Sequence, residues 1–291
     1  MNWIVYHIAS GHAFFTGVAL LIAAVLASSS IRPAVKRVSV LTFLVGVIAI
    51  AVSSTAIPYW LYALAAAITC GWIASRFKKT WHPTAAWLTI AIWLVAALFE
   101  APHHIIPKPH AATSNQVAVI GDSVTAGIGS HDNHETWPSI IAREHLLDVQ
   151  NISHVGETTA SALKRVKKNS FIAQFVFIEI GGNDLLGSTS AKQFALDLEA
   201  LLKYLASEDR QLMMFELPLP PFCHEYGRAQ RQLAAKYKVH LVPKRIFLSV
   251  IADSDSTLDS IHLSPSGHER MADCIWSLIQ PAFTNLQPFR H

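Results

Sequence analysis

The first hundred residues are almost free of charge, and this constrains the fold more than any other feature. Four uncharged apolar runs cover about residues 13–31, 38–57, 59–75 and 84–99. Each is close to the roughly 20 residues that a helix needs to cross a bilayer, although the last two are short enough to be interfacial or re-entrant instead. Helices buried in a soluble protein normally keep a polar stripe, and these runs have none. We therefore expect an all-α transmembrane region of about four helices.

The few charged residues of this region predict its orientation. Six are basic and fall in two loops, whereas the link at 54–58 has none: Arg32, Lys36, Arg37, Arg76, Lys78 and Lys79. Cytoplasmic loops are enriched in Lys and Arg, so the N-terminus and everything after Glu100 should lie on the outer side. The segment 1–12 contains no Lys or Arg and so lacks the charged start of a cleavable signal peptide. We expect the first run to stay in the membrane.

A tether with three prolines follows at residues 101–116. Its histidines, His103, His104 and His110, have no cysteine and no carboxylate other than Glu100 nearby, so we interpret it as a solvated or headgroup-level linker rather than a metal site. The chain then divides into a helical region at 1–100, this linker at 101–116 and a soluble domain at 117–291.

The soluble domain has the composition of an ordinary globular domain. The net charge of +3 comes from the helical region, and no basic stripe interleaved with aromatic residues is present, so the sequence argues against nucleic-acid binding. Cys223 and Cys274 are the only cysteine pair in this domain. Because nothing in the sequence fixes their separation, a disulfide between them is left open.

Apolar strand-like runs alternate with amphipathic helical patterns along this domain. This rhythm predicts a parallel sheet with helices on both faces, with ligands at the carboxyl ends of the strands. The expected strands are 117–120, 149–152, 175–180, 212–217 and 240–242, and the expected helices are 137–147, 158–168, 191–206, 223–237 and 264–279.

Four short stretches of the domain carry distinctive motifs. They are Gly-Asp-Ser-Val-Thr-Ala-Gly at 121–127, Gly-Glu-Thr-Thr at 156–159, Gly-Gly-Asn-Asp-Leu-Leu at 181–186 and Asp-Ser-Ile-His at 259–262. In this order they resemble the four blocks of the GDSL, or SGNH, hydrolases, over about residues 117–279. The Trp-Pro pair at 137–138 and the block at 181–186 are most similar to the bacterial arylesterase and lysophospholipase branch. The resemblance implies a three-layer α/β/α domain, and the helical region lies outside it.

The residue types at these positions suit acyl transfer. Such chemistry needs a hydroxyl nucleophile, a base, a group that orients the base, and donors for the oxyanion. We predict Ser123 as the nucleophile, His262 as the base and Asp259 as the orienting carboxylate. His268 is a rival base, but it has no acid three residues upstream and lies in a helix that Ser264 is expected to cap, so we assign it a packing or surface role.

The predicted oxyanion donors are the side-chain amide of Asn183 and the backbone N–H groups of Gly156 and Ser123. In isolation, the glycine would be a turn and the asparagine a helix cap; their positions at successive strand ends favour the catalytic interpretation. Asp184 should order the Asn183 loop. Solvated loop positions are expected for the remaining polar residues near the motifs: His131, Asp132, His134, His154 and Glu157.

These features together predict a membrane-anchored serine esterase that forms an acyl-serine intermediate and needs no cofactor or metal. Its partners would be the bilayer and an ester substrate: a lysophospholipid, a thioester or a small acyl ester. As an alternative, the resemblance also admits an O-acetylesterase or O-acetyltransferase acting on cell-surface polysaccharide, although four spans are few for the acyl-delivery domains of some related transferases. A further alternative is a non-catalytic membrane scaffold. The expected location is the bacterial cytoplasmic membrane, multi-pass, with the catalytic domain outside; the oligomeric state is left open.

Overall fold

The structure is a computed structural model that describes residues 1–77, 83–127, 135–169, 173–253, 255–259 and 261–286. It contains two compact units. One comprises residues 1–2, 105–217 and 225–291, and the other comprises residues 3–104 and 218–224. Several positions discussed above lie outside the described residues: Lys78, Lys79, His131, Asp132, His134 and Ser260.

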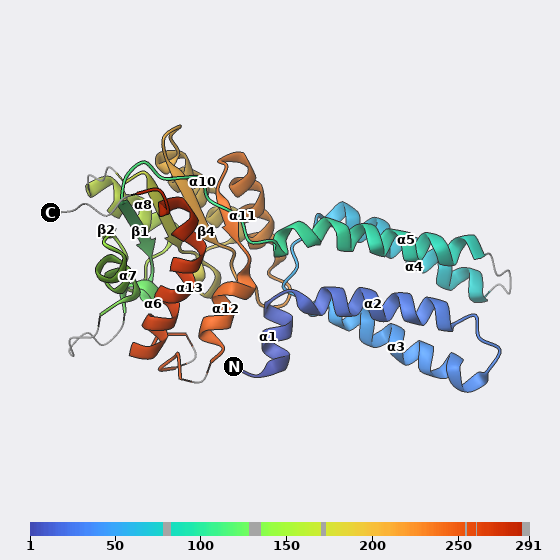
Figure 1. Ribbon diagram of the computed structural model, residues 1–291. Coiled ribbons are helices and arrows are strands. Elements are labelled where there is room, and N and C mark those ends of the chain that lie inside the picture. Colours follow the sequence, from blue (N-terminus) through green and yellow to red (C-terminus); the bar gives the residue numbers. More distant parts are fainter. Residues whose placement is uncertain (78–82, 128–134, 170–172, 254, 260, 287–291) are drawn as a thin grey trace. The chain divides into compact units, whose positions relative to one another are not determined.

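The helical unit is built from one short helix and four long ones (Figure 1). They are α1 (Trp3–Ala9), α2 (His12–Ala27), α3 (Pro33–Val52), α4 (Tyr59–Phe77) and α5 (Pro83–Glu100), followed by a 3₁₀ turn, η1 (Ala101–His104). Proline occupies the first turn of α3 and of α5, where its missing N–H has no intrahelical partner to lose. The four long helices correspond to the four apolar runs of the sequence.

Close packing of small residues joins α2 and α3. A Cβ added at Gly17 would lie 2.7 Å from the carbonyl oxygen of Gly46, and one added at Gly46 would lie 2.9 Å from that of Gly17. Trp93 Nε1 of α5 donates a 3.0 Å hydrogen bond to Thr69 Oγ1 of α4. Backbone contact at small residues and hydrogen bonds between helices are the interactions that hold helices together where water is absent.

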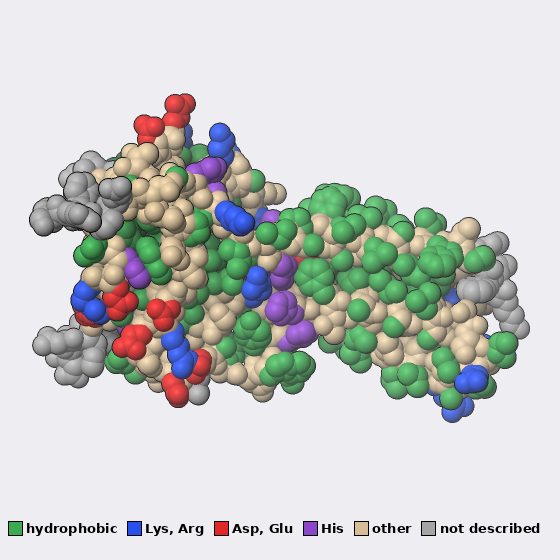
Figure 2. Space-filling view, viewed as in Figure 1, with side chains coloured by type: hydrophobic (Ala, Val, Ile, Leu, Met, Phe, Trp, Pro, Cys, Tyr) green, Lys and Arg blue, Asp and Glu red, His purple; other side chains and the backbone are tan. Residues whose placement is uncertain are grey.

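Apolar side chains gather on the outside of these helices (Figure 2). In the described part of the chain, two helices are long and apolar enough to cross a membrane, Pro33–Val52 and Pro83–His104, or three if the pair α1 and α2, bent by 88°, forms one broken span. The expected count of about four spans is therefore approximate, since length and composition select two or three of the described helices. Taken without α1, helix α2 has only 16 residues. Helix α4 carries Tyr59, Tyr62 and Arg76, which lower its mean hydropathy.

The unit that comprises residues 1–2, 105–217 and 225–291 contains a five-stranded parallel sheet in the order β2-β1-β3-β4-β5. The strands are β1 (Gln116–Gly121), β2 (Asp148–Asn151), β3 (Phe175–Glu179), β4 (Gln211–Phe215) and β5 (His240–Val242). All five match expected strands within a few residues. The central strand β3 is buried along its whole length, as its unbroken apolar run predicts.

Helices cover both faces of this sheet (Figure 1). Helix α13 packs on α7 and on α12, whereas α8 packs on α10. Ser264 Oγ accepts from Gly267 N at 3.1 Å, which confirms Ser264 as the cap of α13. The helices are α6 (Ser123–Ala126), α7 (Trp137–His145), α8 (Thr159–Lys168), α9 (Gly182–Leu186), α10 (Ala191–Leu205), α11 (His224–Lys236), α12 (Lys244–Ile251) and α13 (Pro265–Phe283). The predicted three-layer α/β/α fold is therefore confirmed.

The strand order determines where a site can form. From β1 the chain passes to β2 on one side and then to β3 on the other, so the order reverses between β1 and β3. In open α/β sheets, ligands bind at the carboxyl ends of the strands beside such a reversal. Ser123 follows β1 and Asn183 follows β3, so both lie at this point.

Candidate active site

Ser123 is the first residue of α6 and is separated from β1 only by Asp122, and only 8% of it is exposed. Asp122 caps this short helix, its Oδ1 accepting from Val124 N at 3.0 Å. Gly121 is needed for space, because a Cβ there would lie 2.4 Å from Oγ1 of Thr125. Gly127 has φ +77°, a conformation that favours glycine. The two glycines thus allow a tight turn that fixes the position of Ser123.

His262 lies between Ser123 and Asp259. Its Nε2 is 3.1 Å from Ser123 Oγ, and its Nδ1 is 2.6 Å from Asp259 Oδ2. The other carboxylate oxygen, Oδ1, accepts from His262 N at 2.9 Å and from Ile261 N at 3.2 Å. These hydrogen bonds, with that from the His262 backbone contributing most, lower the pKa of Asp259 to about 2. Asp259 is therefore ionised at any ordinary pH, and the exposure of 57% of its side chain to solvent also favours the charged form.

This chain of contacts fixes the tautomer of the imidazole. An ionised carboxylate can only accept, so Nδ1 carries the hydrogen that bonds to Asp259. Nε2 is then left as an acceptor facing the Ser123 hydroxyl. The arrangement can take a proton from Ser123 as the oxygen attacks an electrophile, which is the chemistry of a nucleophile, base and orienting acid.

Asn183 belongs to the same cluster. Its Nδ2 donates to Asp122 Oδ2 at 3.2 Å and to the carbonyl oxygen of Glu157 at 3.0 Å. Both hydrogens of the amide are thus engaged, so donation to an oxyanion would replace one of these bonds. The second contact joins the loop after β3 to the loop after β2, which carries Gly156 at φ +74°.

The loop after β2 is also tied to the end of β1. His154 N donates to the carbonyl oxygen of Gly121 at 3.1 Å. Arg165 Nε lies 2.6 Å from Glu157 Oε2, so the Glu157 side chain forms an ion pair. The structure therefore brings the loops that carry Gly156, Asn183 and Ser123 together at one edge of the sheet.

The remaining polar candidates have structural partners. His268 is buried in α13, where its Nδ1 accepts from Trp137 N at 3.3 Å, and burial lowers its pKa to about 4. Asp184 accepts from Thr159 N at 2.9 Å and from Thr159 Oγ1 at 3.0 Å. It therefore joins the Asn183 loop to the start of α8. Both contacts agree with the packing and ordering roles expected for these residues.

The described residues contain neither a disulfide nor a cluster of metal-ligand side chains. Among them, no group of three or more His, Cys, Asp or Glu side chains is arranged to hold a metal ion. The three cysteines are free thiols. Burial raises the pKa of Cys274 to about 11, so its thiol is protonated at neutral pH.

Glu179 was not anticipated from the sequence. It ends the buried strand β3 beside Gly121, and its Oε2 accepts from Thr125 Oγ1 at 2.9 Å and from Asp122 N at 3.3 Å. Burial raises its pKa well above the ordinary value. The available signal was a single acidic residue at the end of an otherwise apolar run.

Comparison with known proteins defines the class of this fold and site. Residues 119–270, just over half of the chain, match the GDSL-like Lipase/Acylhydrolase family. The chain belongs to this family and is an enzyme of the GDSL, or SGNH, ester-hydrolase class, as the motifs predicted.

Two relatives illustrate the range of the family. Esterase TesA of Pseudomonas aeruginosa is 26% identical across 58% of this chain and 90% of that protein. Thioesterase 1/protease 1/lysophospholipase L1 of Escherichia coli K12 is 24% identical across 59% of this chain and 86% of that protein. Among solved structures, the psychrotrophic esterase EstA of Pseudoalteromonas sp. has a TM-score of 0.51 and 23% identity, covering 59% of this chain and all of that one. This structural likeness concerns the fold alone.

Proposed function

We propose that this protein hydrolyses carboxylic esters or thioesters through an acyl intermediate on Ser123. The observation that carries the proposal is the unbroken line of contacts from Asp259 through His262 to Ser123 at the reversal point of the sheet. A binding or scaffold domain has no physical need for a nucleophile, a base and an orienting acid in contact.

The first half-reaction follows from these contacts. Ser123 Oγ attacks the carbonyl carbon while its proton passes to His262 Nε2, and Asp259 stabilises the imidazolium that forms. The carbonyl oxygen becomes negative and is stabilised by donors from Asn183, Gly156 and Ser123. The tetrahedral intermediate collapses, the bond to the leaving alcohol or thiol breaks, and His262 returns the proton to it. The acyl group remains on Ser123.

Hydrolysis of the acyl-enzyme reverses these roles. His262 removes a proton from water, whose oxygen attacks the acyl carbon. Collapse of the second intermediate breaks the bond to Ser123 Oγ, which recovers the proton from His262 and releases a carboxylic acid. Transfer to a sugar hydroxyl would follow the same steps with the sugar in place of water, so the site chemistry permits both outcomes.

The helical unit supports a location at the bacterial cytoplasmic membrane. Its candidate spans and exposed apolar side chains fit an anchor, and the basic residues Arg32, Lys36, Arg37 and Arg76 fit cytoplasmic loops, with the hydrolase domain outside. An enzyme held at a bilayer has ready access to single-chain lipids. We therefore propose a lysophospholipid or a long-chain acyl thioester as the substrate, in keeping with the names of the relatives.

Substrate class is tested with the full-length protein in detergent. We expect faster release of fatty acid from a lysophospholipid, or of thiol from an acyl thioester, than of acetate from an acetylated polysaccharide. The Ser123→Ala variant, prepared in the same way, is the control for contaminating esterases. Acetate release or acetyl transfer alone, without activity on the two lipid substrates, would favour the polysaccharide alternative and contradict this assignment.

Asn183→Ala should lower kcat by about 10²- to 10³-fold, because a lost oxyanion donor weakens the transition state most. KM should change little, since the neutral carbonyl of the ground state gains less from this donor. Steady-state kinetics on a soluble ester measures both constants. Asn169→Ala is a matched control: Asn169 is exposed at the end of α8 and donates to the carbonyl oxygen of Arg165 at 2.9 Å. Equal effects of the two variants would contradict the role of Asn183.

A further inference from the structure

Two buried carboxyl groups, those of Asp122 and Glu179, lie next to the segment that carries the nucleophile, and the proposed reaction does not use them. Asp122 precedes Ser123, and Glu179 ends the neighbouring strand β3, in register with Gly121. Glu179 Oε2 accepts from Thr125 Oγ1 at 2.9 Å and from Asp122 N at 3.3 Å. Both carboxyl groups are thus built into the turn that carries Ser123.

The two carboxyl groups adjoin each other, because Glu179 Oε2 accepts from the backbone N of Asp122, and a proton on one carboxyl group would allow it to donate to the other. Burial raises the pKa of Asp122 as well. Its anion is nevertheless the better stabilised of the two, because its oxygens accept from Val124 N at 3.0 Å and from Asn183 Nδ2 at 3.2 Å. A protonated His262 would also favour the anion of Asp122, whereas the carboxylate of Asp184 opposes it. The proton therefore resides on Glu179, whose pKa is raised well above the ordinary value by burial and then by the charge of Asp122.

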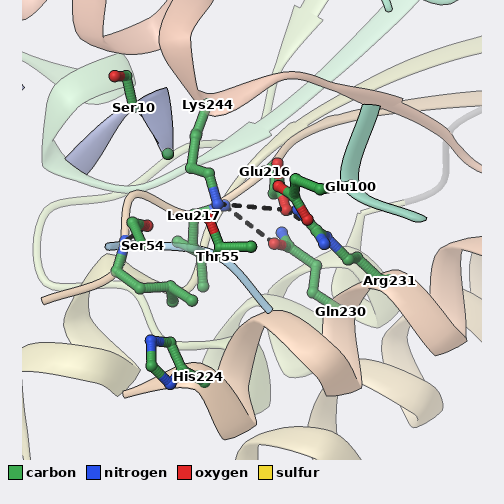
Figure 3. Close-up of polar contacts among 12 residues, drawn as sticks. Ser10, Ser54, Thr55, Glu100, Glu216, Leu217, His224, Gln230, Arg231 and Lys244 are labelled. Atoms are coloured by element: carbon green, nitrogen blue, oxygen red, sulfur yellow. Dashed lines mark hydrogen bonds and ion pairs between the residues drawn. The ribbon is translucent and has the colours of Figure 1, made fainter. Parts of the chain in front are cut away.

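A second buried glutamate shows the usual way to bury a carboxyl group, which is as an anion paired with cations. Glu216 follows β4 and is 1% exposed, but two cations, Arg231 and Lys244, lie beside its carboxylate (Figure 3). Arg231 Nε lies 2.6 Å from Glu216 Oε1, and Lys244 Nζ lies 3.6 Å from the same atom. Among the described residues, no Lys or Arg forms such a pair with Glu179. Glu216 can be buried as an anion, whereas Glu179 has to be buried as an acid.

We propose that Glu179 is a positioning residue that works in its neutral form: it donates its proton to Asp122, whose carboxylate then holds both the Asn183 amide and the turn at Ser123. This inference rests on the proposed function, because it assigns Glu179 to the same reaction. Asp122 and Glu157 hold the two N–H groups of the Asn183 amide before the reaction, so they set the orientation from which one N–H moves to the oxyanion. If Glu179 lost its proton, two adjacent buried anions would repel each other and this arrangement would loosen.

A comparison of Glu179→Gln with Glu179→Met separates the contribution of the Glu179 proton from that of side-chain packing. Glutamine keeps a donor for Asp122 and an acceptor for Thr125 without ionising, whereas methionine has similar length and neither group. We expect Glu179→Gln to retain kcat at neutral pH. As the pH rises, its kcat should fall less than that of the wild type, because the wild type loses the proton of Glu179 and the variant has none to lose there. Glu179→Met should lower kcat by about 10²-fold with little change in KM, because misplaced catalytic groups cost rates of this order.

The dependence of stability on pH gives a readout independent of turnover. A raised native pKa means that the stability linked to this proton is complete below the ordinary pKa of a glutamate and is lost as pH rises through the raised value. The midpoint of thermal unfolding should therefore fall across that window more steeply for the wild type than for Glu179→Gln. In the infrared spectrum at neutral pH, the wild type should also show the band of a protonated carboxyl that Glu179→Gln lacks.

Glu216→Gln is the matched control, since it neutralises a buried carboxylate that is paired with cations. It should lower stability and leave the pH profile of kcat unchanged. Loss of kcat in Glu179→Gln equal to that in Glu179→Met, or no protonated carboxyl band, would overturn the inference. A wild-type enzyme that is inactive and unlabelled at Ser123 would refute the proposed function itself and the catalytic part of this inference, while the infrared band would still report the proton.

Discussion

Ser123→Ala should lower kcat by a factor on the order of 10⁶, because removal of a catalytic serine eliminates the acyl-enzyme route entirely. His262→Ala should lower kcat nearly as much, since the hydroxyl 3.1 Å from its Nε2 then has no base. The double variant should be no worse than either single one, because the two residues act as a unit. Initial rates on a soluble ester, with circular dichroism to verify folding, measure these effects.

A serine outside the site provides the control. Ser249 is exposed in α12 and donates to the carbonyl oxygen of Ile246 at 2.6 Å. Ser249→Ala should therefore keep wild-type turnover. Wild-type turnover in Ser123→Ala would contradict the mechanism, as would losses that simply multiply in the double variant.

Asp259→Asn should lower kcat by about 10⁴-fold, because the substitution favours the wrong tautomer of His262. In the wild type, the carboxylate requires a hydrogen on Nδ1 and leaves Nε2 free to accept from Ser123. The asparagine amide donates to Nδ1 instead, so the hydrogen moves to Nε2, which can no longer act as the base. Fold and substrate binding should be retained, and the loss should appear in kcat.

The pH dependence of this variant is informative as well. Asp259 has a pKa of about 2 and is ionised throughout the working range, so the loss should be present at every pH where the wild type is active. Asp209→Asn, an exposed position in a turn, is the control and should leave kcat unchanged. A variant with wild-type kcat would show that Asp259 does not orient His262.

Much of the hydrolase fold was predictable because its signals are local. Four of the five strands are short apolar runs, β2 being the polar exception, and Ser264 caps α13 as its hydroxyl predicts. Placement of Ser123, Gly156 and Asn183 followed from the rule that loops at the carboxyl ends of parallel strands meet. His262 was instead paired with Asp259 by their spacing of three residues before the last helix. The structure adds the distances between them, and their catalytic roles stay a proposal.

Other features depend on tertiary contacts and left no periodic signal. Helices α6 and α9 have only four and five residues, too few to show a helical period. The protonated state of Glu179 depends on Asp122, which is 57 residues away in the sequence and adjacent only once β1 and β3 pair. Likewise, the bonds of Asn183 to Asp122 and Glu157 join three separate loops.

The helical region was harder to define for a different reason. Helices that are apolar on all sides carry no stripe that fixes their ends or their partners. The count of spans then depends on small differences of length and composition, such as the tyrosines and Arg76 in α4. The close contact of Gly17 with Gly46 likewise appears only when α2 and α3 pack together.

The central claim is that Ser123 is an activated nucleophile. The most direct test treats the full-length protein with a fluorophosphonate and maps the adduct by mass spectrometry of its peptides. We predict one adduct, on Ser123, that forms in step with the loss of esterase activity and forms much more slowly in His262→Ala. Full inhibition with the adduct on another residue, or esterase activity that survives complete labelling of Ser123, would contradict the claim.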